Sequence, residues 1–122
     1  EGLVSEILKS LDFQCTRNFI LTRPRMEIDV IGVKLGIAIL IDCKHWKRLS
    51  NSALRDAVKK QIKRARYYLA KTRMKAAIPT IVTLYRESVS FINKVPIVPI
   101  FQLRSFLEDF YGNMDKLNAI KA

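Results

Sequence analysis

The chain has 122 residues, of which 49% are hydrophobic, and a formal net charge of +11. A chain of this length forms one domain and is too short for two independent cores, and its hydrophobic content excludes general disorder. The excess of 22 Lys and Arg over 11 Asp and Glu residues indicates a polyanionic partner, with nucleic acid favoured over an anionic membrane surface.

The first half of the chain predicts one amphipathic helix followed by three strands. Apolar residues recur at three- and four-residue spacing near the beginning of the chain, and β-branched runs follow. The expected elements are a helix at residues 3–11 and strands at 13–21, 26–33 and 37–44. Because only residues 34–36 separate the last two strands, we expect them to form a hairpin. The third strand is apolar on both faces, which is typical of the centre of a sheet.

The second half predicts a long helix, two strands and a short helix. Ser50, Asn51 or Ser52 can cap the long helix, which runs to about Arg73 and is basic on its outer face. The later elements are strands at residues 79–85 and 95–100 and a helix at 102–110. Residues 86–94 fit neither a helix nor a strand pattern.

These elements predict the order α-β-β-β-α-β-β-α. The expected fold class is α/β in the broad α+β sense, with a central mixed sheet of about five strands flanked by helices. We expect a single domain at residues 1–112, and a tail at residues 113–122 that frays because its sequence loses the pattern.

The remaining composition excludes several kinds of site. Cys15 and Cys43 lie in apolar, strand-like surroundings, which indicates buried free thiols, and a single histidine excludes a Cys/His zinc cluster. No apolar run approaches the ~18 residues of a membrane span, so no membrane insertion is expected. No signal peptide is visible, which predicts a cytoplasmic location, and a chain that starts with Glu1 rather than Met fits a piece of a longer gene product.

Three charged residues around the predicted hairpin carry the chemical signal. Asp42 and Lys44 are two apart and therefore project from one face of the strand end, whereas Cys43 points to the opposite core layer. The hairpin brings Asp29 near them if its register allows. Because unpaired buried charge is costly, one explanation is a Mg²⁺ or Mn²⁺ ion held by both carboxylates, which activates water at a phosphate. The alternative is an Asp/Lys pair at a solvated strand end.

This arrangement resembles the PD-(D/E)xK nuclease superfamily, most closely archaeal Holliday-junction resolvases and restriction-endonuclease-like domains. The resemblance covers about residues 1–110, but its specific motifs lie between Asp29 and Lys44, and Ile28 stands where the superfamily usually has Pro. It implies a restriction-endonuclease-like fold in which Asp29, Asp42 and Lys44 are catalytic. A glutamate of the first helix then joins the two aspartates as a metal ligand.

Two glutamates are candidates for that helix position. Counting back from Asp12 favours Glu1 as a catalytic residue and metal ligand. Glu6 is the alternative, about 140° away around the helix, and its other interpretation is a solvated helix face. Glu27 is a reserve metal ligand because strand alternation places it on the face of Asp29.

Gln61 falls within the apolar stripe of the long helix, where a polar side chain needs a partner. In several branches of the superfamily a Gln on this helix reaches the active site, which makes Gln61 a catalytic candidate. The alternative is a hydrogen bond to a strand end. His45 is expected to be a bystander, and Trp46 fits either packing or substrate contact.

The same helix and the segment before it are rich in cations. Phosphate contacts are sequence-blind, so such a surface suits the backbone of DNA, although a solvated face is the usual interpretation of a charge run. The predicted nucleic-acid contacts are Lys47, Arg48, Lys59, Lys60, Lys63 and Arg64.

The leading hypothesis is therefore a Mg²⁺- or Mn²⁺-dependent endonuclease that hydrolyses duplex or branched DNA, structure-specific or restriction-like, with a homodimer as a plausible assembly. The main alternative is a non-catalytic nucleic-acid-binding module on the same fold. A structural or protein-interaction domain is the third hypothesis, and it predicts no DNA binding at low salt.

Overall fold

The computed structural model describes residues 1–45, 50–84, 88–110, 112 and 116–121. The elements are α1 (Gly2–Ser10), β1 (Gln14–Leu21), β2 (Met26–Lys34), β3 (Ile37–Lys44), α2 (Asn51–Ala70), β4 (Ala76–Thr83), β5 (Ser90–Ile92), β6 (Val95–Pro99), the 3₁₀ helix η1 (Ile100–Gln102), α3 (Leu103–Glu108) and β7 (Ile120–Lys121). No helix in these ranges is both long enough and apolar enough to cross a membrane.

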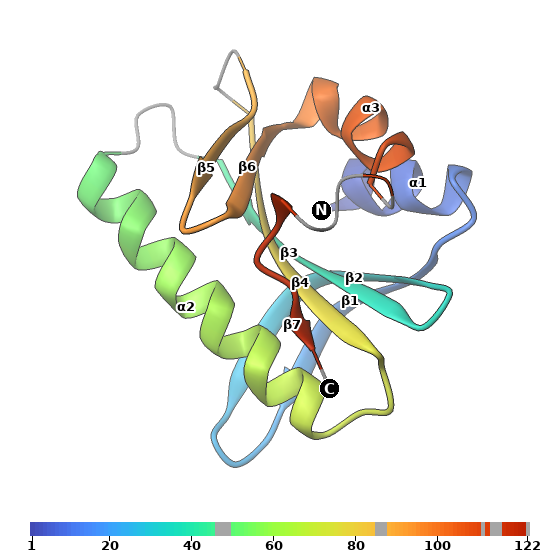
Figure 1. Ribbon diagram of the computed structural model, residues 1–122, viewed down its shortest axis with the longest axis vertical. Coiled ribbons are helices and arrows are strands. Elements are labelled where there is room, and N and C mark those ends of the chain that lie inside the picture. Colours follow the sequence, from blue (N-terminus) through green and yellow to red (C-terminus); the bar gives the residue numbers. More distant parts are fainter. Residues whose placement is uncertain (46–49, 85–87, 111, 113–115, 122) are drawn as a thin grey trace.

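The strands form one mixed sheet in the order β1-β2-β3-β4-β6-β5, with β7 paired to the first two residues of β4 (Figure 1). β4 runs parallel to β3 and β6, and the other pairings are antiparallel. Helices α1 and α3 cover one face of the sheet and α2 covers the other. The predicted α+β class with a mixed sheet flanked by helices is therefore confirmed.

The sheet has seven strands in the described ranges rather than the predicted five or so. β5 and β7 have only three and two residues, too few for a period to be recognised. The tail at residues 113–122 was expected to fray, but its residues Ile120 and Lys121 form β7, in which Ile120 pairs with Ala77. β4 begins earlier than predicted, and Pro79 lies between the segments that pair with β7 and β6, where its missing N–H costs little.

Hydrophobic packing fills both sides of the sheet. Val4 and Leu8 of α1 pack with Leu103 of α3 over one face, while Leu54 and Leu69 of α2 pack over the other. Gly32 allows α1 to approach β2 closely, since a Cβ there would lie 2.8 Å from Leu8 Cδ2. The buried stripe of α2 fixes which of its faces looks outward.

The predicted β2–β3 hairpin is confirmed, and its turn explains the register. Leu35 and Gly36 both have positive φ, at 55° and 78°, as a two-residue type I′ turn requires. The pairing then runs from Lys34 opposite Ile37 to Val30 opposite Ile41. Continuing this register by one step sets Asp29 against Asp42. The turn chemistry therefore determines which acidic residues meet.

Ser50 is the residue that caps α2. Its side-chain oxygen accepts a hydrogen bond from the Ala53 N–H at 3.1 Å, which satisfies one of the free donors at the helix start. The capped helix therefore begins at Asn51, seven residues after the end of β3 in the sequence.

Candidate active site

Asp29 is held against the end of β3 by a backbone hydrogen bond. The β2–β3 ladder stops at Val30 and Ile41, and Asp29 Oδ2 instead accepts the Cys43 N–H at 2.9 Å. A carboxylate that accepts a backbone donor is fixed in orientation as well as position. The bond therefore places one acidic group beside the Asp42–Cys43 peptide.

The strand itself is irregular at Asp29. Ile28 and Ile31 both belong to the core under α2, whereas Val30 belongs to the core under α1, so the usual alternation breaks between them. The β1–β2 ladder also skips the pair of Asn18 and Asp29, and Asn18 has a φ of 53°. Asn tolerates this left-handed conformation better than most residues. The break removes Asp29 from the regular ladder and allows its side chain to reach β3.

Asp42 and Lys44 form an ion pair on the face of β3 that looks toward α2. Asp42 Oδ2 lies 3.2 Å from Lys44 Nζ, and the two side chains are 8% and 23% exposed. Burial raises the pKa of Asp42, the Lys44 charge lowers it in part, and the neighbouring Asp29 raises it again. Asp42 Oδ2 is buried, and the ion pair with Lys44 offsets only part of the cost of burying its charge beside a second carboxylate. A second cation next to this oxygen would therefore be electrostatically favourable.

The raised pKa of Asp42 predicts that Asp42→Asn stabilises the metal-free protein at pH 7, because the neutral amide avoids the cost of burying a carboxylate. The folded pKa of Asp42 is raised above its ordinary value of 3.8, so the stability that protonation supplies is complete below that pH. It is lost as pH rises through the folded pKa. Urea denaturation in EDTA should therefore show a variant-to-wild-type difference that grows from about pH 4 upward. A difference that is independent of pH, or a destabilised variant at pH 7, would contradict this account.

The donor set fits a divalent cation that is held by few protein ligands. Mg²⁺ is commonly bound by one or two carboxylates together with water and substrate phosphates, and Asp29 and Asp42 provide two adjacent carboxylates. Among the described residues, no group of three or more His, Cys, Asp or Glu side chains could hold a metal ion. The structure therefore does not assemble the expected three-ligand set of Glu1, Asp29 and Asp42.

Glu1 nevertheless lies nearer to this region than Glu6. It precedes the first turn of α1 and lines a small pocket of about 50 Å³ with Cys43 and Lys44, whereas Glu6 is exposed. Burial raises the pKa of Cys43 to about 12, and the carboxylates of Asp29, Glu1 and Asp42 contribute to the rise. Cys43 is thus favoured as a neutral thiol at neutral pH, and a neutral thiol is a poor nucleophile. Both cysteines are free, as predicted, but they are half-buried.

Gln61 is fully buried, and one of its two bonds attaches α2 to β3. Its Nε2 donates to the Leu40 carbonyl at 2.7 Å, and its Oε1 accepts from Arg64 Nη1 on the same helix at 3.0 Å. Leu40 lies two residues before Asp42, so the first bond fixes the strand on which the site is built. The geometry matches the alternative in which Gln61 hydrogen-bonds a strand.

A structural role for Gln61 predicts that Gln61→Leu lowers the free energy of unfolding by roughly 2 kcal/mol, because a buried carbonyl loses a donor. Cleavage by the folded variant should stay within about threefold of wild type, since no transition-state contact is removed. Urea denaturation and single-turnover kinetics measure the two effects separately. A large loss of rate with unchanged stability would assign Gln61 to catalysis instead.

Thr83 is a site residue that the sequence did not indicate. It pairs with Lys44 across the parallel β3–β4 ladder and lines the small pocket that contains Glu1 and Lys44. Its buried hydroxyl has no hydrogen-bond partner within the described part of the chain. Threonine is common in strands, so only the tertiary structure distinguishes this one. Its hydroxyl therefore adds a buried polar group next to Lys44.

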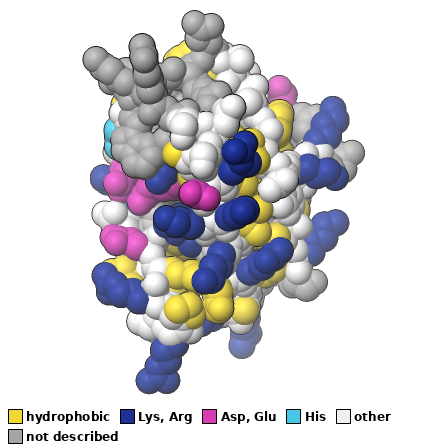
Figure 2. Space-filling view, turned by 90° about the vertical axis from the view of Figure 1, so that its left-hand side faces the viewer, with side chains coloured by type: hydrophobic (Ala, Val, Ile, Leu, Met, Phe, Trp, Pro, Cys, Tyr) yellow, Lys and Arg dark blue, Asp and Glu magenta, His cyan; other side chains and the backbone are white. Residues whose placement is uncertain are grey.

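The predicted cationic surface lies mainly along the outer side of α2. Its exposed Lys59, Lys60, Lys63 and Arg66 side chains are called the basic face here. Figure 2 shows this side of the molecule, with Lys and Arg side chains spread over it and hydrophobic side chains between them. Two shallow depressions, of about 660 and 270 Å³, lie along the helix, and Lys63 lines both.

The other predicted residues lie in different surroundings. Arg64 is half-buried and bonded to Gln61. Glu27, the reserve metal ligand, is exposed and lines the smaller depression with Lys60 and Arg64. His45 is exposed at the end of β3. Trp46, Lys47 and Arg48 lie outside the described residues.

Comparison with known proteins provides relatives without an assigned activity. No family model matches the sequence. A crystal structure of a protein of unknown function, AF1548, has the same fold over 68% of this chain, with a TM-score of 0.51 and 17% identity. This chain spans only 44% of the length of that protein. An uncharacterized protein of Archaeoglobus fulgidus is 33% identical over 115 residues, which cover 91% of this chain and 88% of the relative. The chain therefore belongs to the same family as this uncharacterized archaeal protein.

Proposed function

We propose that the protein is a divalent-metal-dependent endonuclease that hydrolyses phosphodiester bonds in DNA. The observation that carries the proposal is the meeting of two carboxylates and a lysine at the end of β3. Asp29 is fixed there by the Cys43 N–H, and Asp42 pairs with Lys44 at 3.2 Å. Two carboxylates beside one lysine leave uncompensated negative charge, which a bound divalent cation would offset. Phosphate hydrolysis uses such a cation together with a positively charged side chain.

In this proposal Asp29 and Asp42 hold Mg²⁺ or Mn²⁺. When bound, such a cation lowers the pKa of a coordinated water and offsets negative charge on the phosphate. The burial of Asp42 next to a second carboxylate supports this assignment, because a bound cation would offset the repulsion between the two charges. Glu1 is a second-line candidate ligand, because it lines the pocket beside Lys44 but does not form a cluster with the aspartates.

Lys44 supplies the cationic group that meets the substrate. The Lys44 ammonium orients the attacking water or offsets charge on the phosphate as it becomes five-coordinate. Thr83 lies at the same step of the β3–β4 ladder, and its buried hydroxyl adds a polar group behind Lys44.

The basic face is the feature that favours a polymeric, phosphate-containing substrate. Phosphates repeat along DNA, and Lys59, Lys60 and Lys63 follow one another along the helix that Gln61 bonds to β3. A restriction-endonuclease-like fold of the PD-(D/E)xK type is part of the proposal. It is supported by the spacing of Asp29, Asp42 and Lys44 and by the mixed sheet between helices.

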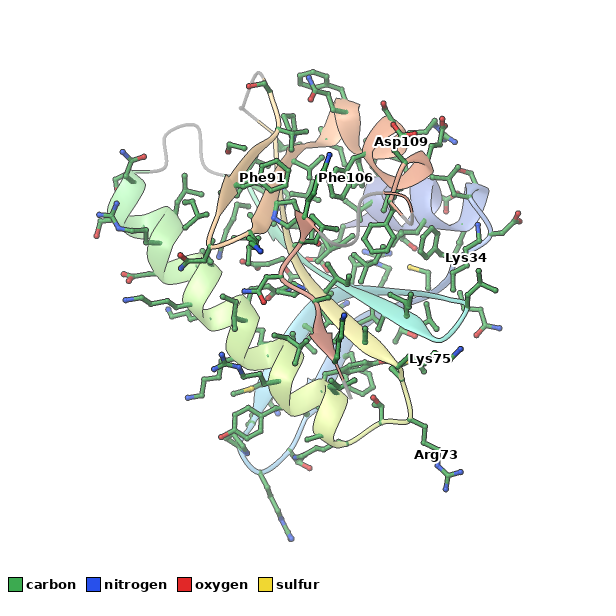
Figure 3. The ribbon with its side chains drawn as sticks, in the orientation of Figure 1. Lys34, Arg73, Lys75, Phe91, Phe106 and Asp109 are labelled. Carbon is green, nitrogen blue, oxygen red and sulfur yellow. The ribbon has the colours of Figure 1, made fainter. Side chains whose placement is uncertain are left out.

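A panel of supercoiled, linear and branched DNA, incubated with Mg²⁺, Mn²⁺ or EDTA, tests the proposed activity. We expect metal-dependent cutting by the wild type and its loss in Lys44→Gln. Lys75→Gln is the matched control, because Lys75 lies on the far side of the molecule from the outer side of α2 (Figure 3). The proposal fails if no substrate is cut, or if Lys44→Gln cuts as fast as the control.

A non-catalytic nucleic-acid-binding module is the second candidate. It is favoured by the absence of a three-ligand metal cluster among the described residues and by the structural bonds of Gln61. This candidate predicts DNA binding that is steeply salt-dependent, equal in EDTA and Mn²⁺, and unaccompanied by cutting.

A further inference from the structure

Tyr67 is an aromatic side chain on the outer side of α2, where packing does not require one. Its neighbour Tyr68 is 6% exposed and packs edge-on against Phe19, with ring centroids 5.7 Å apart. Successive helix residues point about 100° apart, so Tyr67 is turned away from the core and is 36% exposed. The core therefore uses one ring of the Tyr67–Tyr68 pair and leaves the other at the surface.

Cations surround the exposed ring. Lys63 lies one helical turn before Tyr67, and both line the larger depression on α2, together with Lys59 and Arg66. Ile62 and Ala70 supply the apolar part of its lining. A flat ring beside apolar side chains, with three cations along it, is complementary to a nucleobase attached to a phosphate chain. A second copy of this chain would bring the same cations together and be repelled.

We propose that this depression binds single-stranded nucleic acid, with one unpaired base stacked on Tyr67 and phosphates on Lys59, Lys63 and Arg66. The inference rests on the nucleic-acid partner of the proposed function, but not on its cleavage chemistry. Duplex DNA presents phosphates outward and keeps its bases stacked on each other, so it engages the cations without the ring. The ring thus gives the surface a preference for unpaired segments, such as single-stranded ends.

Fluorescence anisotropy in EDTA tests this preference without cleavage. The probes are a labelled oligothymidylate, a strand of equal length with abasic sites, and a blunt duplex. Tyr67→Ala should weaken oligothymidylate binding about 10-fold, while duplex and abasic-strand binding change little. Tyr67→Phe keeps the ring and should bind as wild type. Phe91→Ala is the control, because Phe91 is an exposed ring on β5 beside Phe106, away from α2 (Figure 3).

The possible outcomes separate the two proposals. If Tyr67→Ala binds oligothymidylate as tightly as wild type, or loses duplex binding equally, the stacking site is overturned while the nucleic-acid partner stands. If no probe binds at low salt, the partner itself is overturned. If Tyr67→Ala weakens only oligothymidylate binding and the cleavage panel shows no cutting, the stacking site stands and only the nuclease activity fails.

Discussion

Asp42→Asn is expected to reduce single-turnover DNA cleavage about 10³-fold, the loss typical of removing a group that supports charge in the transition state. Asparagine has nearly the same shape but cannot balance a divalent cation. Because Asp42 is buried and is not one of the exposed cations of the basic face, DNA affinity measured in EDTA should be unchanged. Metal affinity should fall in parallel, which isothermal titration with Mn²⁺ can measure.

The matched control for this change is Asp56→Asn. Asp56 is an exposed acidic residue on α2, so its substitution makes the same change of net charge at a position outside the site. Cleavage by the control should remain within about twofold of wild type. Equal rates for Asp42→Asn and Asp56→Asn would show that the carboxylate at the end of β3 takes no part in the reaction.

Reversal of three charges on the basic face has the second largest expected effect. A variant with Lys59→Glu, Lys60→Glu and Lys63→Glu should bind duplex DNA about 100-fold more weakly at low salt. Its dependence on salt should also become shallower, since fewer counterions are released. Anisotropy titrations at several salt concentrations measure both quantities.

A second triple variant makes the same change of net charge elsewhere. Lys9, Arg73 and Arg104 are exposed on α1, after α2 and on α3, so their replacement by Glu keeps the net charge of the test variant. If both variants lose affinity equally, overall charge and not this surface binds DNA. A charge run that merely aids solubility would leave both affinities unchanged.

Much of the fold could be predicted because its central elements carry strong local signals. The Leu35-Gly36 turn and the apolar strands around it predict a hairpin, and Ser50 marks the start of α2. β5 and β7 could not be found, because they are short and exist only through pairing with β6 and β4. Tertiary pairing, rather than local preference, creates such strands.

The candidate site was predictable to the extent that it follows from register. Asp42 and Lys44 meet because strand side chains alternate, and the hairpin brings Asp29 to them. The hydrogen bonds of Gln61 and the isolated hydroxyl of Thr83 depend on how α2 and β4 pack against β3, which spacing does not specify. The position of Glu1 depends on how α1 docks, and sequence could not determine its distance from the aspartates.

The central claim is that Asp29 and Asp42 support metal-dependent cleavage, and nicking of a supercoiled plasmid tests it most directly. Wild type and the Asp29→Asn, Asp42→Asn double variant would be purified in parallel and incubated with Mn²⁺. We predict that the wild type nicks the plasmid, that EDTA stops it, and that the double variant leaves the plasmid intact. Nicking at equal rates by both proteins, or no nicking by the wild type, would contradict the account.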